Sequence, residues 1–129
     1  MSGSFLLDTN IVIALFAEDP TVETQLSRAV SVCVPAIVLG ELYYGSYKSA
    51  RFQENLVRLN QFAAQSAVLS CDADTARHYG RIKDELRRKG KPAPENDIWI
   101  AALSIQYDMT LVTRDAHFGE MSELTVESW

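Results

Sequence analysis

The chain has 129 residues, of which 47% are hydrophobic and 22% charged, and its formal net charge at pH 7 is −5. A chain of this length folds as one domain that buries roughly two-thirds of its unfolded surface. No segment approaches the roughly 20 consecutive apolar residues of a membrane span, and the N-terminal segment lacks the basic region of a signal peptide. We therefore expect one cytoplasmic domain over residues 1–129.

The two cysteines, Cys33 and Cys71, form neither a CxxC motif nor a Cys/His cluster at zinc-ligand spacing. Neither a disulfide framework nor a structural zinc site is indicated. We expect two reduced thiols in or near the core.

Short apolar runs alternate with amphipathic segments along the whole chain. In the first half we expect, in chain order, a strand at 5–7, helices at 10–16 and 21–30, a strand at 31–34 and a helix at 36–44 that Gly45 ends. In the second half we expect a helix at 50–65, a strand at 67–69, a helix from Asp72 or Asp74 to about Lys89, a loop at 91–96, a helix at 97–107, and strands at 110–113 and 125–126. This alternation predicts a three-layer α/β/α sandwich around a short, mainly parallel central sheet.

Two acidic residues follow predicted strands. Asp8 comes directly after residues 5–7, and Asp115 comes after the TLVT run at 110–113 with only Arg114 between them. Because an open parallel sheet binds ligands beyond the carboxyl ends of its strands, we expect both carboxylates on the same rim.

Two further acidic residues lie in unusually apolar helical segments. Glu41 shares a predicted helix face with Ile37 and Val38 in PAIVLGELYYG, and Asp97 opens the helix of NDIWIAALSI. Burying an unpaired carboxylate costs several kcal/mol, and no lysine or arginine lies beside Glu41 in the sequence. The sequence therefore predicts that all four acids gather at one site.

Each acid also has a simpler explanation. Asp8 is compatible with a helix N-cap, Asp97 with a first-turn charge, Asp115 with a turn residue, and Glu41 with a charge that reaches out of a half-buried helix. Four carboxylates on one rim would repel one another, and bound cations would remove that conflict. All-oxygen ligands suit Mg²⁺ or Mn²⁺, which lower the pKa of bound water and hold the oxygens of a phosphodiester in line.

Short polar residues flank these acids, and we expect them to orient the carboxylates, hold a water or contact phosphate. They are Thr9, Asn10, Asn96 and Thr113. Roles as caps and turn formers explain them equally well.

Six of the twelve Lys and Arg residues lie in the run RIKDELRRKGK, which covers residues 81–91. Together with Arg114, which precedes Asp115, they would draw an RNA backbone toward the acidic site. The candidate RNA-binding residues are Arg81, Lys83, Arg87, Arg88, Lys89, Lys91 and Arg114. The same run is also typical of a solvated helix end whose cations meet the helix dipole before Gly90.

Four segments of the chain together resemble PIN-domain ribonucleases, in particular the VapC toxins of bacterial and archaeal toxin–antitoxin pairs. The segments are LLDTN (6–10), PAIVLGELYYG (35–45), NDIWIAA (96–102) and LVTRDAHF (111–118). They occur in order over nearly the whole chain, each with its acid in place.

The resemblance implies a Mg²⁺- or Mn²⁺-dependent endoribonuclease that inhibits translation or growth. Asp8, Asp97 and Asp115 would hold the metal, and Glu41 would position a metal ligand or the attacking water. The resemblance also implies an RNA substrate such as tRNA or ribosomal RNA, a homodimer, and a small antitoxin that covers the acidic site. Hydrolysis by metal-activated water would leave 5′-phosphate and 3′-hydroxyl ends.

One position departs from the family pattern. Many PIN domains carry a further acid two residues after the fourth, where this chain has His117. The departure leaves a second metal ion open, and we expect His117 to be a structural or phosphate-side residue and not a ligand. Tyr43, Tyr44 and Tyr47 are expected either to line the antitoxin groove or to pack in the core.

The residues alone leave other functions open. Haloacid-dehalogenase-type phosphatases also place an Asp after the first strand, within a DxD motif, but here Asn10 stands at the second acid. Phosphoreceiver domains need a lysine after a late strand, and no lysine occurs after Lys91. A non-catalytic module would bind RNA or protein through the basic run, with structural acids. Metal-dependent cleavage of RNA distinguishes these alternatives.

Overall fold

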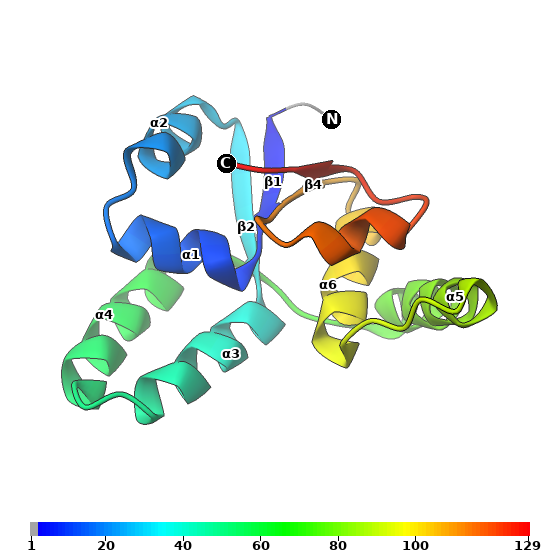
Figure 1. The fold of residues 1–129 in the computed structure, drawn as a ribbon. Helices are drawn as coiled ribbons and strands as arrows, with labels where there is room; N and C mark the ends of the chain where they lie inside the picture. The colour runs from blue at the N-terminus through cyan, green and yellow to red at the C-terminus, as the bar shows by residue number, and fades with distance from the viewer. Residues whose placement is uncertain (1–2) are drawn as a thin grey trace.

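The computed structural model describes residues 3–129, which form a five-stranded parallel sheet flanked by helices (Figure 1). The strands are β1 (Ser4–Leu7), β2 (Ser31–Pro35), β3 (Ala67–Leu69), β4 (Thr110–Val112) and β5 (Val126–Glu127). They lie in the order β3-β2-β1-β4-β5, and every neighbouring pair is parallel. The predicted α/β sandwich with a mainly parallel sheet is confirmed.

Within residues 3–129, six α-helices and one short 3₁₀ helix connect the strands. They are α1 (Thr9–Phe16), α2 (Pro20–Arg28), α3 (Ala36–Tyr47), α4 (Phe52–Gln65), α5 (Ala73–Lys89), α6 (Glu95–Gln106) and the 3₁₀ helix η1 (Ala116–Glu120). In Figure 1, α1, α2 and α4 lie to the left of the strands, α5 and α6 lie to the right, and α3 continues below from β2. The carboxyl ends of the strands therefore open onto one edge, where α1, α3 and α6 begin.

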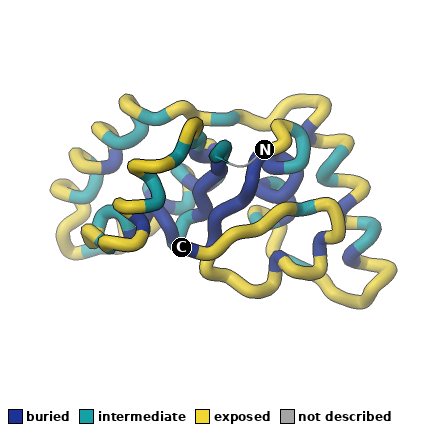
Figure 2. The backbone as a smooth tube through the Cα atoms, turned by 90° about the horizontal axis from the view of Figure 1, so that it is seen from above, coloured by how far each residue is buried: buried dark blue, intermediate teal, exposed yellow. Residues whose placement is uncertain are grey.

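The core is built on the two central strands, as the dark interior of Figure 2 illustrates. Leu6 of β1 pairs in register with Cys33 of β2 and Leu111 of β4, and both leucines are completely buried. Full burial of a leucine side chain stabilises the folded state by roughly 1.5–3 kcal/mol. α6 packs against this sheet and buries apolar residues on most of its circumference, which explains why its sequence is apolar with no clear stripe.

The ends of α5 match the sequence prediction. Asp72 is its N-cap and forms a capping box with Thr75, whose backbone N–H donates to Asp72 at 3.1 Å. Gly90 ends the helix in the left-handed region, with φ of 66°.

Three details of the prediction are wrong. Gly45 does not end α3, because the helix continues to Tyr47 and buries Ser46, whose hydroxyl donates to the carbonyl of Leu42 at 3.0 Å. α6 begins at Glu95, two residues earlier than expected, with Pro94 as its N-cap residue. Cys71 is exposed on the segment before α5, whereas Cys33 is half-buried; both thiols are free.

Smaller differences concern the C-terminal segment. The last strand is Val126–Glu127 and not 125–126, because Leu111 already pairs with Val126. The helix η1 was not predicted, since its five residues are too few for a recognisable periodicity. Within residues 3–129, no helix is both long and apolar enough to cross a membrane.

Candidate active site

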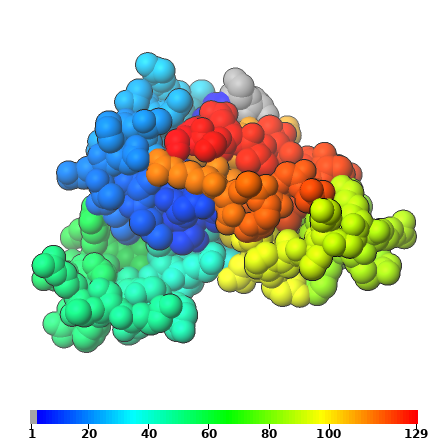
Figure 3. All heavy atoms as spheres, in the orientation of Figure 1, coloured from blue at the N-terminus to red at the C-terminus, as the bar shows by residue number. Residues whose placement is uncertain are grey.

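The four predicted acids reach the edge of the sheet at which the strands end. β1 ends one residue before Asp8, and β4 ends one residue before Thr113. Glu41 lies in the second turn of α3, and Asp97 lies in the first turn of α6. Figure 3 shows the blue, cyan, yellow and orange segments that carry these residues meeting on one face of the molecule.

Asp8 is both a helix cap and part of this site. Its side chain is buried, and Oδ1 accepts a hydrogen bond of 2.8 Å from the backbone N–H of Thr9 at the start of α1. Its other oxygen, Oδ2, accepts from the hydroxyl of Thr113 at 2.7 Å. The N-cap role therefore does not exclude a role in the site, because the cap uses only one of the two carboxylate oxygens.

Asn10 and Thr113 fix the loop after β4 against α1. The side-chain N–H of Asn10 donates to the Thr113 hydroxyl oxygen at 3.3 Å, and its carbonyl oxygen accepts from the backbone of Arg114 at 3.1 Å. The hydroxyl oxygen of Thr113 also accepts from the backbone N–H of Asp115 at 3.0 Å. A single buried hydroxyl thus connects the position of Asp8 with that of Asp115.

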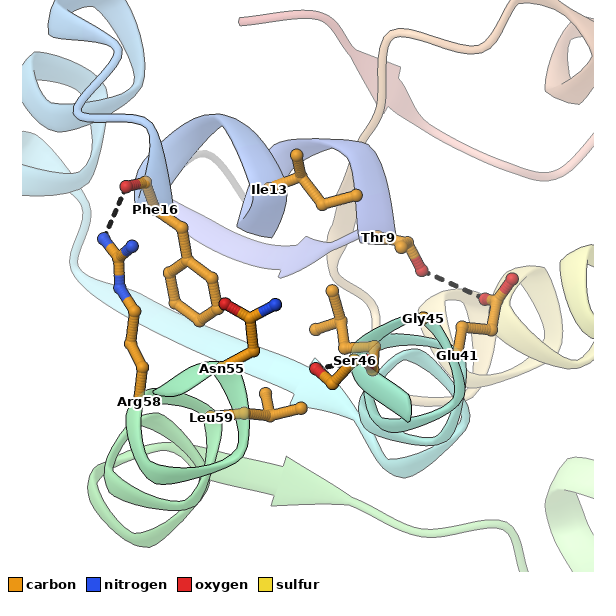
Figure 4. Close-up of a pocket in the computed structure, with 10 residues that line it drawn as sticks. Thr9, Ile13, Phe16, Glu41, Gly45, Ser46, Asn55, Arg58 and Leu59 are labelled. Atoms are coloured by element: carbon orange, nitrogen blue, oxygen red, sulfur yellow. Dashed lines mark hydrogen bonds between the residues drawn. The ribbon is translucent and has the colours of Figure 1, made fainter. Parts of the chain in front are cut away.

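Glu41 is half-buried on α3 and faces α1. The hydroxyl of Thr9 donates to its Oε1 at 3.0 Å (Figure 4). Burial raises the pKa of Glu41, the bond from Thr9 opposes that shift, and the negative charges of Asp8 and Asp97 add to it. Asn96 is close enough to stabilise the charged form of Glu41 through its side chain.

A cavity of about 320 Å³ lies beside Glu41, between α1, α3 and α4. Thr9 and Glu41 form one end of it, and Phe16 and Arg58 lie at the other end, where Arg58 donates to the carbonyl of Phe16 (Figure 4). The acidic rim therefore continues into a hollow whose wall combines polar and apolar residues. Of the three tyrosines that follow Glu41, Tyr44 and Tyr47 are exposed on the surface of α3, and Tyr43 packs against the core.

Asp97 and Asp115 are joined by His117. Nε2 of His117 contacts Oδ2 of Asp97, and Nδ1 lies 2.7 Å from Oδ1 of Asp115. Burial lowers the pKa of the imidazole, but the two carboxylates more than offset this effect and leave it raised. Sequence reasoning gave His117 no partner. The only hint in the sequence was that His117 follows Asp115 by two residues. That spacing does not by itself predict a contact, because the ring meets the acids only through the turn of η1.

The electrostatics of the site favour a cation. Burial raises the pKa of Asp8, hydrogen bonds from Thr113 and Thr9 oppose the shift, and repulsion from Asp97 and Asp115 adds to it. A divalent ion would reverse this repulsion, and carboxylate oxygens are suitable ligands for Mg²⁺ or Mn²⁺. The residues present therefore fit a divalent metal ion of this kind.

The predicted basic residues lie apart from the acids, mostly on α5, and most are paired. The ion pairs are Arg81 with Glu123, Lys83 with Glu95, Arg87 and Arg88 with Asp84, Lys89 with Glu85, and Arg114 with Asp19. Lys91 is exposed on the loop after α5. The pair of Lys83 with Glu95 brings the second half of α5 next to the start of α6, two residues from Asp97.

Arg114 differs from the other cations because its side chain forms hydrogen bonds that join distant segments of the fold. Its Nε donates to the carbonyl of Trp129 at 2.7 Å, and its Nη2 donates to Asp19 at 2.9 Å. The guanidinium therefore turns toward α2 and the C-terminal segment, and it does not join the acidic residues.

Comparison with known proteins gives a consistent result. The PIN domain family model matches residues 5–124. Ribonuclease VapC2 of Haemophilus influenzae is 36% identical, and the tRNA(fMet)-specific endonuclease VapC of Shigella flexneri is 33% identical; each match covers 97% of both chains. Among solved structures, DNA-bound VapBC from Salmonella typhimurium superposes with a TM-score of 0.90 at 29% identity, over 98% of both chains.

The family match excludes the phosphatase and phosphoreceiver alternatives and confirms the resemblance that the four sequence segments indicated. The fold, the order of those segments and the full-length identity agree with one another. This chain belongs to the PIN-domain family and, within it, to the VapC ribonucleases.

Proposed function

We propose that this protein is a Mg²⁺- or Mn²⁺-dependent endoribonuclease and the toxin of a toxin–antitoxin pair. One observation carries the proposal: four carboxylates from four separate segments converge at the carboxyl ends of β1 and β4. Burial, with added repulsion between the carboxylates, raises the pKa values of Asp8 and Glu41, and a bound cation would offset both effects. The family membership adds ribonuclease activity as the expected chemistry.

In this proposal Asp8, Asp97 and Asp115 hold the metal, directly or through water. When bound, a divalent ion supplies a water of lowered pKa and neutralises charge on the phosphodiester. Thr113 and Asn10 orient Asp8 by their bonds to Oδ2, and the Thr113 hydroxyl also sets the backbone of Asp115.

Glu41 positions the attacking water. Thr9 holds one carboxylate oxygen, which leaves Oε2 available to accept a hydrogen bond from water. The half-buried setting keeps this carboxyl more basic than an exposed glutamate, which suits a group that must take up a proton. Asn96 lies beside the same carboxylate and would steady it or contact a phosphate oxygen.

The basic run on α5 binds the RNA backbone. Its cations are held by exposed ion pairs, which contribute only about 0–1 kcal/mol each, so phosphate oxygens can replace the carboxylates at little cost. Lys83 and Arg87 lie on the side of α5 that faces the start of α6, Arg88 is exposed on another side of the helix, and Lys91 is exposed on the loop that joins α5 to α6. Arg81 and Lys89 lie toward the C-terminal segment, where they contact Glu123 and Glu120, and Arg114 would contribute only by releasing Asp19.

The substrate class and the partners follow from the relatives. The Shigella flexneri relative is named for cleavage of the initiator tRNA, which makes tRNA the first substrate to test, with ribosomal RNA as the second. The VapC membership supports a small antitoxin that covers the acidic site, a homodimer and a cytoplasmic location. We also propose that the chain is a single catalytic domain, since the family model spans residues 5–124.

The test is cleavage of RNA by the purified chain, free of antitoxin. We expect 5′-phosphate products from a mixed tRNA pool with Mg²⁺ or Mn²⁺, and no products with EDTA. Asp97→Asn should lower the cleavage rate by about 100-fold or more, because it removes a ligand charge. Asp108→Asn is the matched control, since Asp108 lies at the far end of α6. Cleavage that persists with EDTA and in Asp97→Asn would refute the mechanism.

A further inference from the structure

His117 occupies an unusual place between two of the four acids. One nitrogen of its ring faces Asp97, and the other faces Asp115. One ligand atom from each of the three side chains lies within 4.8 Å of the other two. Neighbouring ligands of a six-coordinate ion with bonds of about 2.1 Å lie roughly 3 Å apart, so this spacing suits a shared ion after small side-chain movements.

The ring of His117 is held by the fold and still accessible. It stacks on Phe118 with a centroid distance of 5.1 Å and an interplanar angle of 18°, and Phe118 is buried in the core. The His117 side chain is 39% exposed. An imidazole fixed in this way loses little freedom when it binds an ion, while an ion can still reach it from solvent.

The chemistry of imidazole makes this position selective. A neutral imidazole nitrogen ligates first-row transition-metal ions, with an affinity that rises along the series from Mn²⁺, whereas Mg²⁺ strongly prefers oxygen ligands. With Nε2 directed to the ion, Nδ1–H remains able to donate to Oδ1 of Asp115. A hydrogen bond from the second ring nitrogen to a carboxylate is the usual way in which a ligating histidine is oriented.

We propose that His117 is a direct ligand of the catalytic divalent ion, together with Asp97 and Asp115, and that its nitrogen makes the site prefer Mn²⁺ over Mg²⁺. This inference rests on the metal dependence in the proposed function. It reverses the expectation from sequence that His117 is not a ligand. The competing explanation is that His117 only offsets the negative charge of Asp97 and Asp115 when no metal is bound. In that case its side chain would have to move away from the two carboxylates before an ion could bind.

Binding of Mn²⁺ alone to the full-length chain tests the proposal without RNA. Bound Mn²⁺ should show electron spin-echo modulation from a directly coordinated imidazole nitrogen. The chain has only two histidines, so His78→Ala is the matched control and should keep that signal, whereas His117→Ala should lose it. His117→Ala should also weaken Mn²⁺ binding by about tenfold or more, with a smaller effect on Mg²⁺.

A second variant keeps the test independent of any folding defect in His117→Ala. His117→Asp replaces the nitrogen by oxygen, so it should still bind metal but lose the nitrogen signal and the preference for Mn²⁺ in competition with Mg²⁺. The proposal is overturned if the wild type shows no nitrogen coupling, if the coupling survives in both variants, or if His117→Ala binds Mn²⁺ as tightly as the wild type or more tightly.

The cleavage assay separates this inference from the proposed function. Metal-dependent cleavage of RNA without nitrogen coupling would remove His117 as a ligand and leave the ribonuclease mechanism intact. Nitrogen coupling in a protein that cleaves no RNA would keep the ligand assignment and refute the proposed activity.

Discussion

The hydroxyl of Thr113 donates a hydrogen bond of 2.7 Å to Oδ2 of Asp8, although the two residues are 105 positions apart in the chain. The bond is buried and joins the first residues after two neighbouring parallel strands. Because the same oxygen of Thr113 accepts from the backbone of Asp115, it relates two candidate metal ligands to each other. The geometry of the site thus depends on a residue that we do not expect to bind metal.

The first prediction concerns this hydroxyl. Thr113→Val preserves the shape of the side chain but removes the donor to Asp8, and leaving a buried carboxylate without its partner costs about 1–3 kcal/mol in the free energy of unfolding. The cleavage rate should fall by about tenfold, since partners that orient ligands usually contribute that much. Chemical denaturation and single-turnover cleavage measure the two effects. Thr113→Ser keeps the hydroxyl and should retain most of the activity; equal losses in both variants would count against the orienting role.

The second prediction concerns the ion pair of Asp19 with Arg114. The bond from Arg114, helped by the α2 N-cap bonds from Val22 and Thr21, holds the pKa of Asp19 below the ordinary value of 3.8. A lowered pKa in the folded state stabilises the protein above the unfolded pKa, and this contribution is lost as pH falls through the folded pKa. Asp19→Asn retains a capping oxygen, so the wild type should be more stable at pH 7 and the difference should close below about pH 4.

Denaturation of both proteins across the pH range measures this difference. Arg114→Gln provides the control, because Asp19→Asn should have a smaller effect in a chain that already lacks the guanidinium. A difference that stays constant from pH 7 to pH 3 would show that the charge of Asp19 contributes nothing.

The third prediction compares two glycines that sequence reasoning treated alike. Gly90 has φ of 66°, so Gly90→Ala should destabilise the fold by about 1 kcal/mol. Gly45 lies inside α3, and an added Cβ there would have no neighbour within 4 Å. Gly45→Ala should therefore stabilise the fold by about 0.5–1 kcal/mol. Thermal unfolding of the metal-free chains checks both signs, and a loss of stability in Gly45→Ala would contradict the helix as described.

These two glycines show which features of the fold could be predicted from the sequence and which could not. The strands and the positions of Asp8 and Asp115 were predictable, because apolar runs are local and parallel strands end at a common edge. The continuation of α3 through Gly45 was not, since it depends on burial of Ser46 against residues distant in sequence. A single glycine is a weak signal when tertiary packing supports the next turn.

The candidate site shows the same limit in its polar contacts. Composition and strand order predicted that four acids meet, but the partners of each acid depend on side-chain direction. Thr9 holds Glu41 across 32 positions, and His117 reaches Asp97 across 20. Arg114 was expected to face RNA, yet Asp19 and Trp129 bind its side chain. Both partners are distant in sequence from Arg114, so the local motif could not predict them.

The last prediction tests the basic run at residues 81–91, which ends on the loop after α5. Lys91→Gln and Arg88→Gln should each raise the KM for RNA and leave the rate at saturating RNA unchanged, because both residues would contact phosphates away from the bond that is cut. Each should also reduce the slope of log affinity against log salt by about 1. Filter binding to RNA at several salt concentrations, in Ca²⁺ or with Asp97→Asn to prevent cleavage, measures the slope.

Arg28→Gln is the matched control for these variants. Arg28 is the last residue of α2 and lies just before β2, so it is at the edge of the sheet opposite the acids. A general loss of positive charge would weaken binding equally in all three variants, whereas a defined RNA contact at residues 81–91 weakens it only in Lys91→Gln and Arg88→Gln. The ion pair of Arg88 with Asp84 predicts a smaller effect for that residue than for Lys91, because phosphate must first displace the carboxylate.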